Sequence, residues 1–285
     1  MRLCDLHIHS CHSDGTFTPF EIVDRAKEKG LFAISITDHD EICAIEPSRT
    51  YGEEKGLQVI SGVELSAIYK DKEIHILGYL FDENKKNLKQ KLALVRKYRE
   101  ERAKGILEKL KSYGFHIEFE LVKSIAGQGA IGRPHIAQAM LKSNIIRNYK
   151  EAFVKYIGNG KPCNVPKFRF SPEEAIGLIG DAGGASVIAH PGNIRDDTIV
   201  AQLLQFPFAG IEVFHPDHNS NQIKNYLSIA KERSLIATGG SDSHGIVPTK
   251  APIGGVTVDY SVVELLREWC QAPSPFNPPS TEVST

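Results

Sequence analysis

The opening stretch DLHIH carries three side chains that could bind a metal ion. Asp5, His7 and His9 alternate with Leu6 and Ile8 in what reads as a first strand. Successive side chains of a strand point to opposite faces, so the two histidines and the aspartate share one face. Two imidazoles beside a carboxylate need a partner, which is either a metal ion or water.

Residues of the same types recur where six later strands are expected to end. They are Asp38/His39, Glu64, His75, His190, Glu212/His215 and Asp242/His244. In a parallel barrel, the carboxyl ends of the strands converge on one face of the molecule, where functional sites are built. The sequence therefore predicts that His7 and His9 belong to a ring of side chains contributed by seven strands.

This ring predicts a multinuclear metal site. Imidazoles and carboxylates suit manganese, which we expect, with zinc or iron(II) as alternatives. The candidates outnumber the about four to six ligands of one ion, so two or three divalent ions are expected, with Glu64 or Asp242 bridging. Clustered ions lower the pKa of a shared water, and the resulting bridging hydroxide suits an in-line displacement at phosphorus or carbon. The candidate ligands are His7, His9, Asp14, His39, Glu64, His75, His190, Asp242 and His244.

Local signals place helices and strands around these residues. Thr18 with Glu21, and Ser171 with Glu174, read as capping boxes at two helix starts. Apolar runs over 31–37, 57–67 and 73–81 predict strands, the last two joined by a polar turn. The alternation of strands and helices favours a parallel sheet, either open or closed into a barrel.

The middle of the chain differs in pattern and charge. A long amphipathic helix is expected over 87–115, with shorter helices near 134–141 and 149–156. Residues 85–169 carry 20 Lys/Arg and 6 Asp/Glu, whereas the rest of the chain has a balance of -15. A basic insert on an acidic body suits a polyanionic substrate, and a solvated helical face is the alternative. The predicted domains are a discontinuous barrel over 1–83 and 170–271, a basic and mainly helical substrate subdomain over 84–169, and a disordered tail over 272–285.

Composition restricts where such a protein works. The 285 residues are 41% hydrophobic and 24% charged, with no apolar run of the length that spans a bilayer. Five scattered cysteines without a CxxC pair favour a reducing environment over a disulfide framework. We therefore expect a cytoplasmic protein without a signal peptide, a membrane contact or an obligate protein partner.

The motifs HIH, TDHD, GVE, IHILGY, AHP and SDSH, in this order, resemble the PHP (polymerase and histidinol phosphatase) superfamily of metal-dependent phosphoesterases. The resemblance covers residues 1–257 and implies an α/β fold, a distorted seven-stranded (βα)7 barrel of TIM-like type with a helical insertion. HSDGT, GRPHIA and YIGNGKP resemble the branch of nucleoside 3′,5′-bisphosphate phosphatases and 5′–3′ exoribonucleases of the RNase AM type.

The resemblance also implies how the ligands divide among the ions. His7, His9, Glu64 and Asp242 would hold a first ion. Glu64 would bridge to a second ion held by His75 and His190, and the third would be held by Asp14, His39 and His244. Histidinol phosphatases of the superfamily often carry histidine at the position of Asp14, so this residue points away from them.

Five further residues are candidates for substrate contact or proton transfer. Arg133 and His135 resemble the family's phosphate contacts, and a guanidinium can hold a phosphate bidentately. The alternatives are an exposed surface arginine for Arg133 and a capping or packing residue for His135. His215 and His218 follow a strand and could touch substrate or protonate the leaving oxygen. Asp40 is expected to orient the His39 imidazole.

These observations predict a hydrolase that removes the 3′-phosphate of nucleoside 3′,5′-bisphosphates, degrades short 5′-phosphorylated RNA from its 5′ end, or does both. The first alternative is a small-molecule phosphomonoesterase such as histidinol-phosphate phosphatase, which would not need the basic insert. The second is a PHP module that binds nucleic acid beside a polymerase without turnover. Decayed modules usually lose ligands, and every ligand position is filled here.

Overall fold

The computed structural model describes residues 2–127, 129–168, 170–247 and 250–272. Its strands are β1 (Leu3–Ile8), β2 (Ala33–Ile36), β3 (Gln58–Tyr69), β4 (Lys72–Tyr79), β5 (Ala185–Ile188), β6 (Gly210–Phe214), β7 (Ile236–Gly239) and β8 (Val258–Asp259). They form one sheet in the order β7-β6-β5-β4-β3-β2-β1-β8. The Ser243 carbonyl beyond β7 accepts a hydrogen bond from the His9 N–H beyond β1 at 2.9 Å, so β1 to β7 close into a nearly complete barrel.

Two strands depart from the parallel arrangement expected from the sequence: the short β8, which pairs antiparallel with β1 at the edge of the sheet, and β4 within the barrel. β4 runs antiparallel to both β3 and β5, whereas β1/β2, β2/β3, β5/β6 and β6/β7 are parallel. Lys70 and Asp71, which join β3 to β4, both have positive φ values of 47° and 61°. Such a two-residue turn connects antiparallel strands, because a parallel pair needs a long crossover. His75 therefore reaches the ring from the first half of its strand and not from the end.

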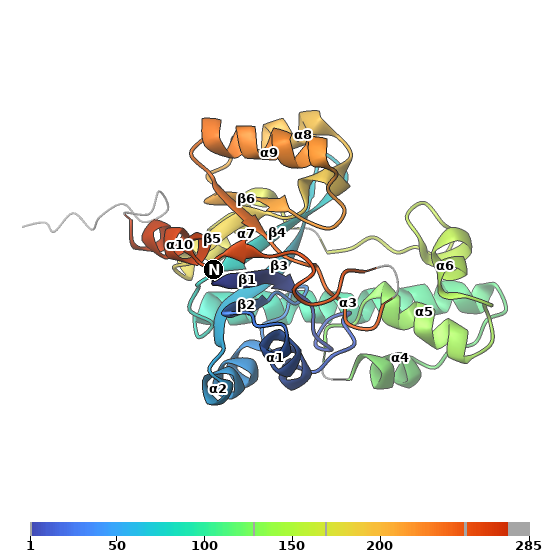
Figure 1. Cartoon of the computed structure of the whole chain (residues 1–285). Helices are drawn as coiled ribbons and strands as arrows, with labels where there is room; N and C mark the ends of the chain where they lie inside the picture. The colour runs from blue at the N-terminus through green and yellow to red at the C-terminus, as the bar shows by residue number, and fades with distance from the viewer. Residues whose placement is uncertain (1, 128, 169, 248–249, 273–285) are drawn as a thin grey trace, which may run out of the picture.

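Helices cover the outside of the barrel (Figure 1). They are α1 (Pro19–Glu28), α2 (Ile45–Lys55), α7 (Pro172–Asp181), α8 (Asp197–Leu203), α9 (Ser220–Glu232) and α10 (Ser261–Gln271), with a 3-10 turn η2 (Pro191–Ile194). Figure 1 shows α1 and α2 on one side of the sheet and α8 and α9 on the opposite side. Over the part of the chain that the structure describes, none of the helices combines the length and apolar character needed to cross a bilayer.

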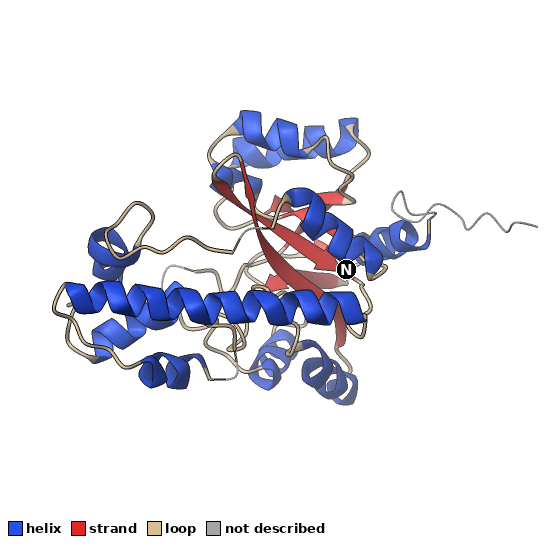
Figure 2. Ribbon diagram, turned by 180° about the vertical axis from the view of Figure 1, so that it is seen from behind, coloured by secondary structure: helices blue, strands red, loops and turns tan. Residues whose placement is uncertain are grey.

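The helices between β4 and α7 form an extension beside the barrel. They are α3 (Lys86–Ser112), α4 (Phe119–Ala126), α5 (Arg133–Lys142), α6 (Tyr149–Glu151) and a π-helical turn η1 (Ala152–Ile157). α3 spans both parts: it crosses the sheet on the side that faces the viewer in Figure 2 and continues into the extension. The extension buries its own apolar cluster, in which Ile106 and Leu110 of α3 pack with Val122, Met140 and Ile157.

Local signals in the sequence account for some helix starts and not for others. The capping boxes of Thr18 with Glu21 and of Ser171 with Glu174 both form, at α1 and α7. The sequence pattern did not predict α2 or α4. α2 begins after Ala44, whose side chain cannot cap a helix, so packing against the barrel stabilises it. Apart from Ala272, the tail expected over 272–285 lies outside the described residues.

Candidate metal centre

The nine predicted ligands lie together at one end of the barrel. Four overlapping groups among them bring their ligand atoms within 4.8 Å of one another: His9/Asp14/His39/His244, His7/Glu64/His190, His7/His9/Asp242 and His39/Glu64/His75. The sequence separation within these groups is large, so the closure of the barrel assembles them.

Glu64, in the middle of β3, is the centre of the cluster. Its Oε1 lies 2.9 Å from His75 Nδ1 and 2.8 Å from His190 Nε2. Its Oε2 lies 3.1 Å from His39 Nδ1 and 3.2 Å from His9 Nε2. Each carboxylate oxygen therefore faces a different pair of imidazoles, which is the arrangement that a bridging ligand requires.

Asp242, after β7, provides the second central carboxylate. Its Oδ1 lies 3.1 Å from His9 Nε2 and 3.5 Å from His7 Nε2. Its Oδ2 lies 3.4 Å from His215 Nε2 and is paired with the ammonium of Lys250. Lys250 carries no motif in the sequence, and sequence reasoning did not identify it.

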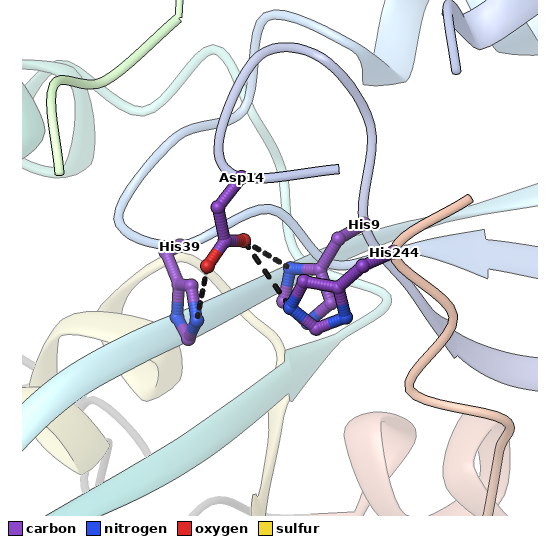
Figure 3. A group of neighbouring side chains, drawn as sticks. All are labelled: His9, Asp14, His39 and His244. Atoms are coloured by element: carbon purple, nitrogen blue, oxygen red, sulfur yellow. Dashed lines mark ion pairs between the residues drawn. The ribbon is translucent and has the colours of Figure 1, made fainter. Parts of the chain in front are cut away.

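Asp14 gathers the third group of histidines, as Figure 3 shows. Its Oδ1 lies 3.3 Å from His244 Nε2 and 3.8 Å from His9 Nδ1, and its Oδ2 lies 3.9 Å from His39 Nε2. A tight turn holds Asp14 in this place. A Cβ atom at Gly15 would lie 2.3 Å from the His9 carbonyl oxygen, so the turn requires glycine there.

Asp38 secures the same turn from the end of β2. Its carboxylate accepts hydrogen bonds from the Ser10 N–H at 2.7 Å, the Ser10 hydroxyl at 2.5 Å and the Ser13 hydroxyl at 2.5 Å. These contacts explain why serines flank the histidines in the HSCHSDGT stretch. Asp38 therefore acts on the position of the turn that carries Asp14.

The buried carboxylates of the ring give it a strongly negative electrostatic potential. Burial by itself raises the pKa of Glu64, but His39, His75 and His7 more than offset it and hold that pKa well below its usual range. Burial lowers the pKa of His9, yet hydrogen bonds with Asp242 and Glu64 raise it to about 10. The site therefore requires positive charge, which protonated imidazoles or divalent cations can supply.

Orphaned atoms in the ring test whether cations fit. Among the described residues, His39 Nδ1, Glu64 Oε2 and His215 Nε2 are buried and make no well-aligned hydrogen bond, although His39 Nδ1 faces Glu64 Oε2 at 3.1 Å and His215 Nε2 faces Asp242 Oδ2 at 3.4 Å. Buried polar atoms nearly always make well-aligned hydrogen bonds, so atoms that only face one another in this way suit ligands around a shared cation. Imidazole nitrogens and carboxylate oxygens are ligands for manganese, iron(II) and zinc. The residues present fit divalent metal ions.

Glu212 of β6 contacts two of the predicted ligands, His7 and His190, and fixes their positions. It is fully buried, its Oε1 lies 2.8 Å from His7 Nδ1, and its Oε2 accepts the His190 N–H at 2.7 Å. A carboxylate on Nδ1 fixes the imidazole with Nε2 free for a metal. Sequence reasoning placed Glu212 at a strand end without giving it a role; a lone carboxylate within the apolar run GIEVF was the available signal.

The ring opens into a cavity of about 860 Å³ between the barrel and the insert. The barrel side includes His75, His190 and Lys250, and the insert contributes Pro134 and Tyr149. A second cavity, of about 170 Å³, adjoins it and contains four cationic side chains and His135. The cations are Arg99, Arg102, Arg133 and Lys167.

The second cavity, hereafter the cationic cavity, holds positive charge that its surroundings only partly neutralise. Burial, followed by repulsion from Arg133 and Arg99, lowers the pKa of Arg102 to about 10. Arg133 donates to Asn159 Oδ1 at 2.7 Å, and burial lowers its pKa too. Mutually repelling buried cations favour an anionic ligand.

Two candidates for proton transfer, His215 and His218, lie in different environments. His218 bonds the Val213 carbonyl oxygen through Nδ1 at 2.9 Å and accepts the Gly192 N–H through Nε2 at 3.1 Å. Both of its ring nitrogens are engaged by the backbone, which contradicts the predicted role in catalysis. His215 accepts the Asp217 N–H through Nδ1 at 3.1 Å, and its Nε2 faces the predicted metal ligands.

Asp40 differs from what the sequence predicts, whereas His135 has the capping role that was its alternative. The Asp40 carboxylate pairs with the Arg99 guanidinium and accepts the Ser66 N–H at 2.8 Å, and no hydrogen bond joins it to His39 among the residues described. Asp40 therefore ties α3 to the barrel, and the predicted orientation of His39 by Asp40 is wrong. His135 caps its own helix, since its Nδ1 accepts the Gly132 N–H at 3.0 Å, while it lines the cationic cavity.

A barrel with this His/carboxylate ring beside a cationic cavity defines a hydrolase of phosphate esters that depends on metal ions. The chain belongs to the PHP domain family, whose model matches residues 5–160. The family predicted from the motifs is therefore confirmed.

Relatives and solved structures agree with this assignment. The chain is 32% identical over 251 residues to the 5′-3′ exoribonuclease Rnm of Escherichia coli, covering 86% of both chains. It is 32% identical over 250 residues to the 3′,5′-nucleoside bisphosphate phosphatase of Chromobacterium violaceum, covering 86% of this chain and 88% of the relative. A structure from Bifidobacterium adolescentis, described as a candidate metal-dependent phosphoesterase, superimposes with a TM-score of 0.84 at 30% identity, covering 92% of this chain and 94% of the other. The predicted barrel class is confirmed.

Proposed function

We propose that the chain hydrolyses the 3′-phosphate of nucleoside 3′,5′-bisphosphates and releases mononucleotides from the 5′ end of short 5′-phosphorylated RNA. The observation that supports this substrate class is the cationic cavity next to the ring. One phosphate of a substrate can react at the ring while another binds to the cations. Both relatives compared above carry names for such activities.

The ring supports a proposed assignment of ligands to ions. His7, His9, Glu64 and Asp242 would hold the first ion. Glu64 would share a second with His75 and His190, and Asp14, His39 and His244 would hold a third. Manganese is the proposed ion, with zinc and iron(II) as alternatives, because this donor set accepts all three. When bound, such ions supply Lewis acidity toward phosphate oxygens and lower the pKa of water.

The chain's own residues position the substrate and handle one proton. Arg133, with Arg99, Arg102 and Lys167, would hold the 5′-phosphate and thereby orient the 3′-phosphate toward the ring. His215 is the proposed proton donor to the leaving oxygen: its Nδ1 accepts the Asp217 N–H, which leaves the proton on Nε2, and this nitrogen faces Asp242 Oδ2 at 3.4 Å in the ring. His135 would keep the first turn of α5 in place, with Arg133 aimed into the cavity.

The two parts of the chain would have different roles, one in metal binding and the other in substrate binding. The barrel of residues 1–83 and 170–271 would carry the ring, and residues 84–169 would form the substrate subdomain that carries all four cations. The ammonium of one of them, Lys167, pairs with Glu73 of β4 in the barrel. All five cysteines are unpaired, which supports a reducing, cytoplasmic compartment.

Phosphate release from adenosine 3′,5′-bisphosphate, and mononucleotide release from a 5′-phosphorylated RNA pentamer, test this function with manganese and with a chelator. Adenosine 3′-phosphate and histidinol phosphate serve as matched substrates that lack the second phosphate. We expect KM to rise strongly without the 5′-phosphate. An unchanged KM, or faster hydrolysis of histidinol phosphate, would refute the proposed substrate. Tight binding of long RNA without turnover in manganese would favour a binding module.

A further inference from the structure

The ring cavity and the cationic cavity share one wall. Of the residues that line them, five line both: Asp14, His39, Glu73, His75 and Pro134. If one phosphate of a nucleotide binds at the ring and the other at the cations, the sugar that joins them must pass this wall. Three of the five are proposed metal ligands and Pro134 has no polar side chain, so Glu73 is the polar group left for the sugar.

Glu73 keeps one carboxylate oxygen available. Its Oε1 lies 3.3 Å from His75 Nε2 and is paired with the Lys167 ammonium. No hydrogen bond to Oε2 occurs among the described residues, and the side chain is 31% exposed. The Lys167 ammonium on Oε1 pairs with Glu73 in its carboxylate form, which accepts hydrogen bonds and donates none.

We propose that Glu73 binds the ribose 2′-hydroxyl of the substrate and makes the enzyme prefer ribonucleotides to deoxyribonucleotides. This inference rests on the proposed function. In a nucleoside 3′,5′-bisphosphate both other sugar oxygens that could carry a proton are esterified, so the 2′-hydroxyl is the sugar's one hydrogen-bond donor. A hydroxyl donating to a carboxylate forms a charge-assisted hydrogen bond.

The surroundings of Glu73 explain how a carboxylate can stand between two phosphates. Lys167 and His75 contact its Oε1 from either side and offset its charge toward the phosphates. The same contacts hold the side chain, so little rotamer freedom is lost when the sugar binds. When the 2′-hydroxyl is missing, water can reach the exposed part of Glu73 and replace the lost hydrogen bond in part. We therefore expect kcat/KM to be about tenfold higher for the ribonucleotide than for the deoxyribonucleotide, which corresponds to the weaker hydrogen bonds made by charged groups.

The test compares kcat/KM for adenosine and 2′-deoxyadenosine 3′,5′-bisphosphates in the wild-type protein with manganese and in the Glu73→Ala variant. The wild type should prefer the ribonucleotide about tenfold, and the variant should show a ratio near one. A structural effect through His75 would lower kcat for both substrates equally and leave the ratio unchanged. Lys167→Met is the matched control, because it removes the other partner of Glu73 and keeps the acceptor.

Inhibition by the products supplies a second readout, because it compares the binding of two 5′-mononucleotides that the enzyme does not turn over. Adenosine 5′-phosphate and 2′-deoxyadenosine 5′-phosphate differ only in the 2′-hydroxyl, and their inhibition constants should differ in the wild type and converge in Glu73→Ala. A ratio that is already near one in the wild type, or that survives in Glu73→Ala, would overturn the role of Glu73. Failure of the wild type to hydrolyse either bisphosphate would instead overturn the proposed function itself.

Discussion

Replacing Glu212 by glutamine changes the ring without touching a proposed ligand. The buried carboxylate has two partners, His7 Nδ1 at 2.8 Å and the His190 N–H at 2.7 Å. When His7 offers Nε2 to a metal, its Nδ1 carries the proton, so both partners are donors. A glutamine has the same shape but only one acceptor oxygen. Its NH₂ group must therefore face either the His7 N–H or the His190 N–H.

The cost of Glu212→Gln follows from the bond that is lost. A hydrogen bond to a charged group contributes about 1.5–3 kcal/mol. Each 1.4 kcal/mol is a factor of about ten, so affinity for ions held by His7 and His190 should fall roughly 10- to 150-fold. This range overlaps the loss of about 10- to 100-fold typical of changed second-layer carboxylates. The group of Asp14, His39 and His244 has no contact with Glu212 among those described, so its ion should be affected least.

Calorimetric titration of the chelator-treated protein with manganese measures this change directly. Glu264→Gln is the matched control: Glu264 lies on the surface of α10, where it pairs with Arg2 at 3.1 Å, and its replacement should leave manganese affinity unaltered. Circular dichroism and the thermal midpoint establish that both variants are folded. Manganese affinity in folded Glu212→Gln within about twofold of the wild type, less than one such hydrogen bond is worth, would refute the orienting role of Glu212.

Three further outcomes are expected. Arg99→Met leaves the buried Asp40 carboxylate without its cation and should lower the free energy of unfolding in urea by about 3 kcal/mol. The control is Lys155→Met, which breaks an exposed ion pair and should not shift the midpoint of urea unfolding. Arg133→Ala should raise KM for adenosine 3′,5′-bisphosphate about 10- to 100-fold and leave KM for adenosine 3′-phosphate unchanged, so equal effects on both would contradict a 5′-phosphate site. Chelation should abolish hydrolysis and lower the thermal midpoint, with manganese restoring both; a midpoint that ignores manganese would argue against ions bound in the folded ring.

The gathering of these histidines and carboxylates at one end of the barrel can be predicted from the sequence, because strands impose a simple order on their side chains. His7 and His9 share a face since side chains alternate along a strand, and parallel strands end at one edge of a barrel. The capping box at α1 depends only on residues three apart, Thr18 and Glu21. Such features involve contacts within a few residues or a rule common to all barrels, so the residues alone indicate them.

Partners of the polar side chains depended on the tertiary structure. Asp40 meets Arg99, 59 positions along the chain, because α3 packs across one side of the sheet, and no sequence pattern near Asp40 predicts this contact. His218 looks like a free imidazole in its motif, but the turn of η2 brings the Gly192 N–H to its Nε2. Burial then forces each polar atom to take the nearest available partner.

The sequence by itself determined which residue types stand at the strand ends, where α1 and α7 begin, and that a basic segment interrupts the barrel. The tertiary structure decided the reversed direction of β4, the support of His7 by Glu212, and the shared wall where Glu73 lies between two cavities. The physical reason is the range of the interactions. Caps and alternation act over a few residues, whereas cavities and buried ion pairs form only when segments far apart in the chain pack together.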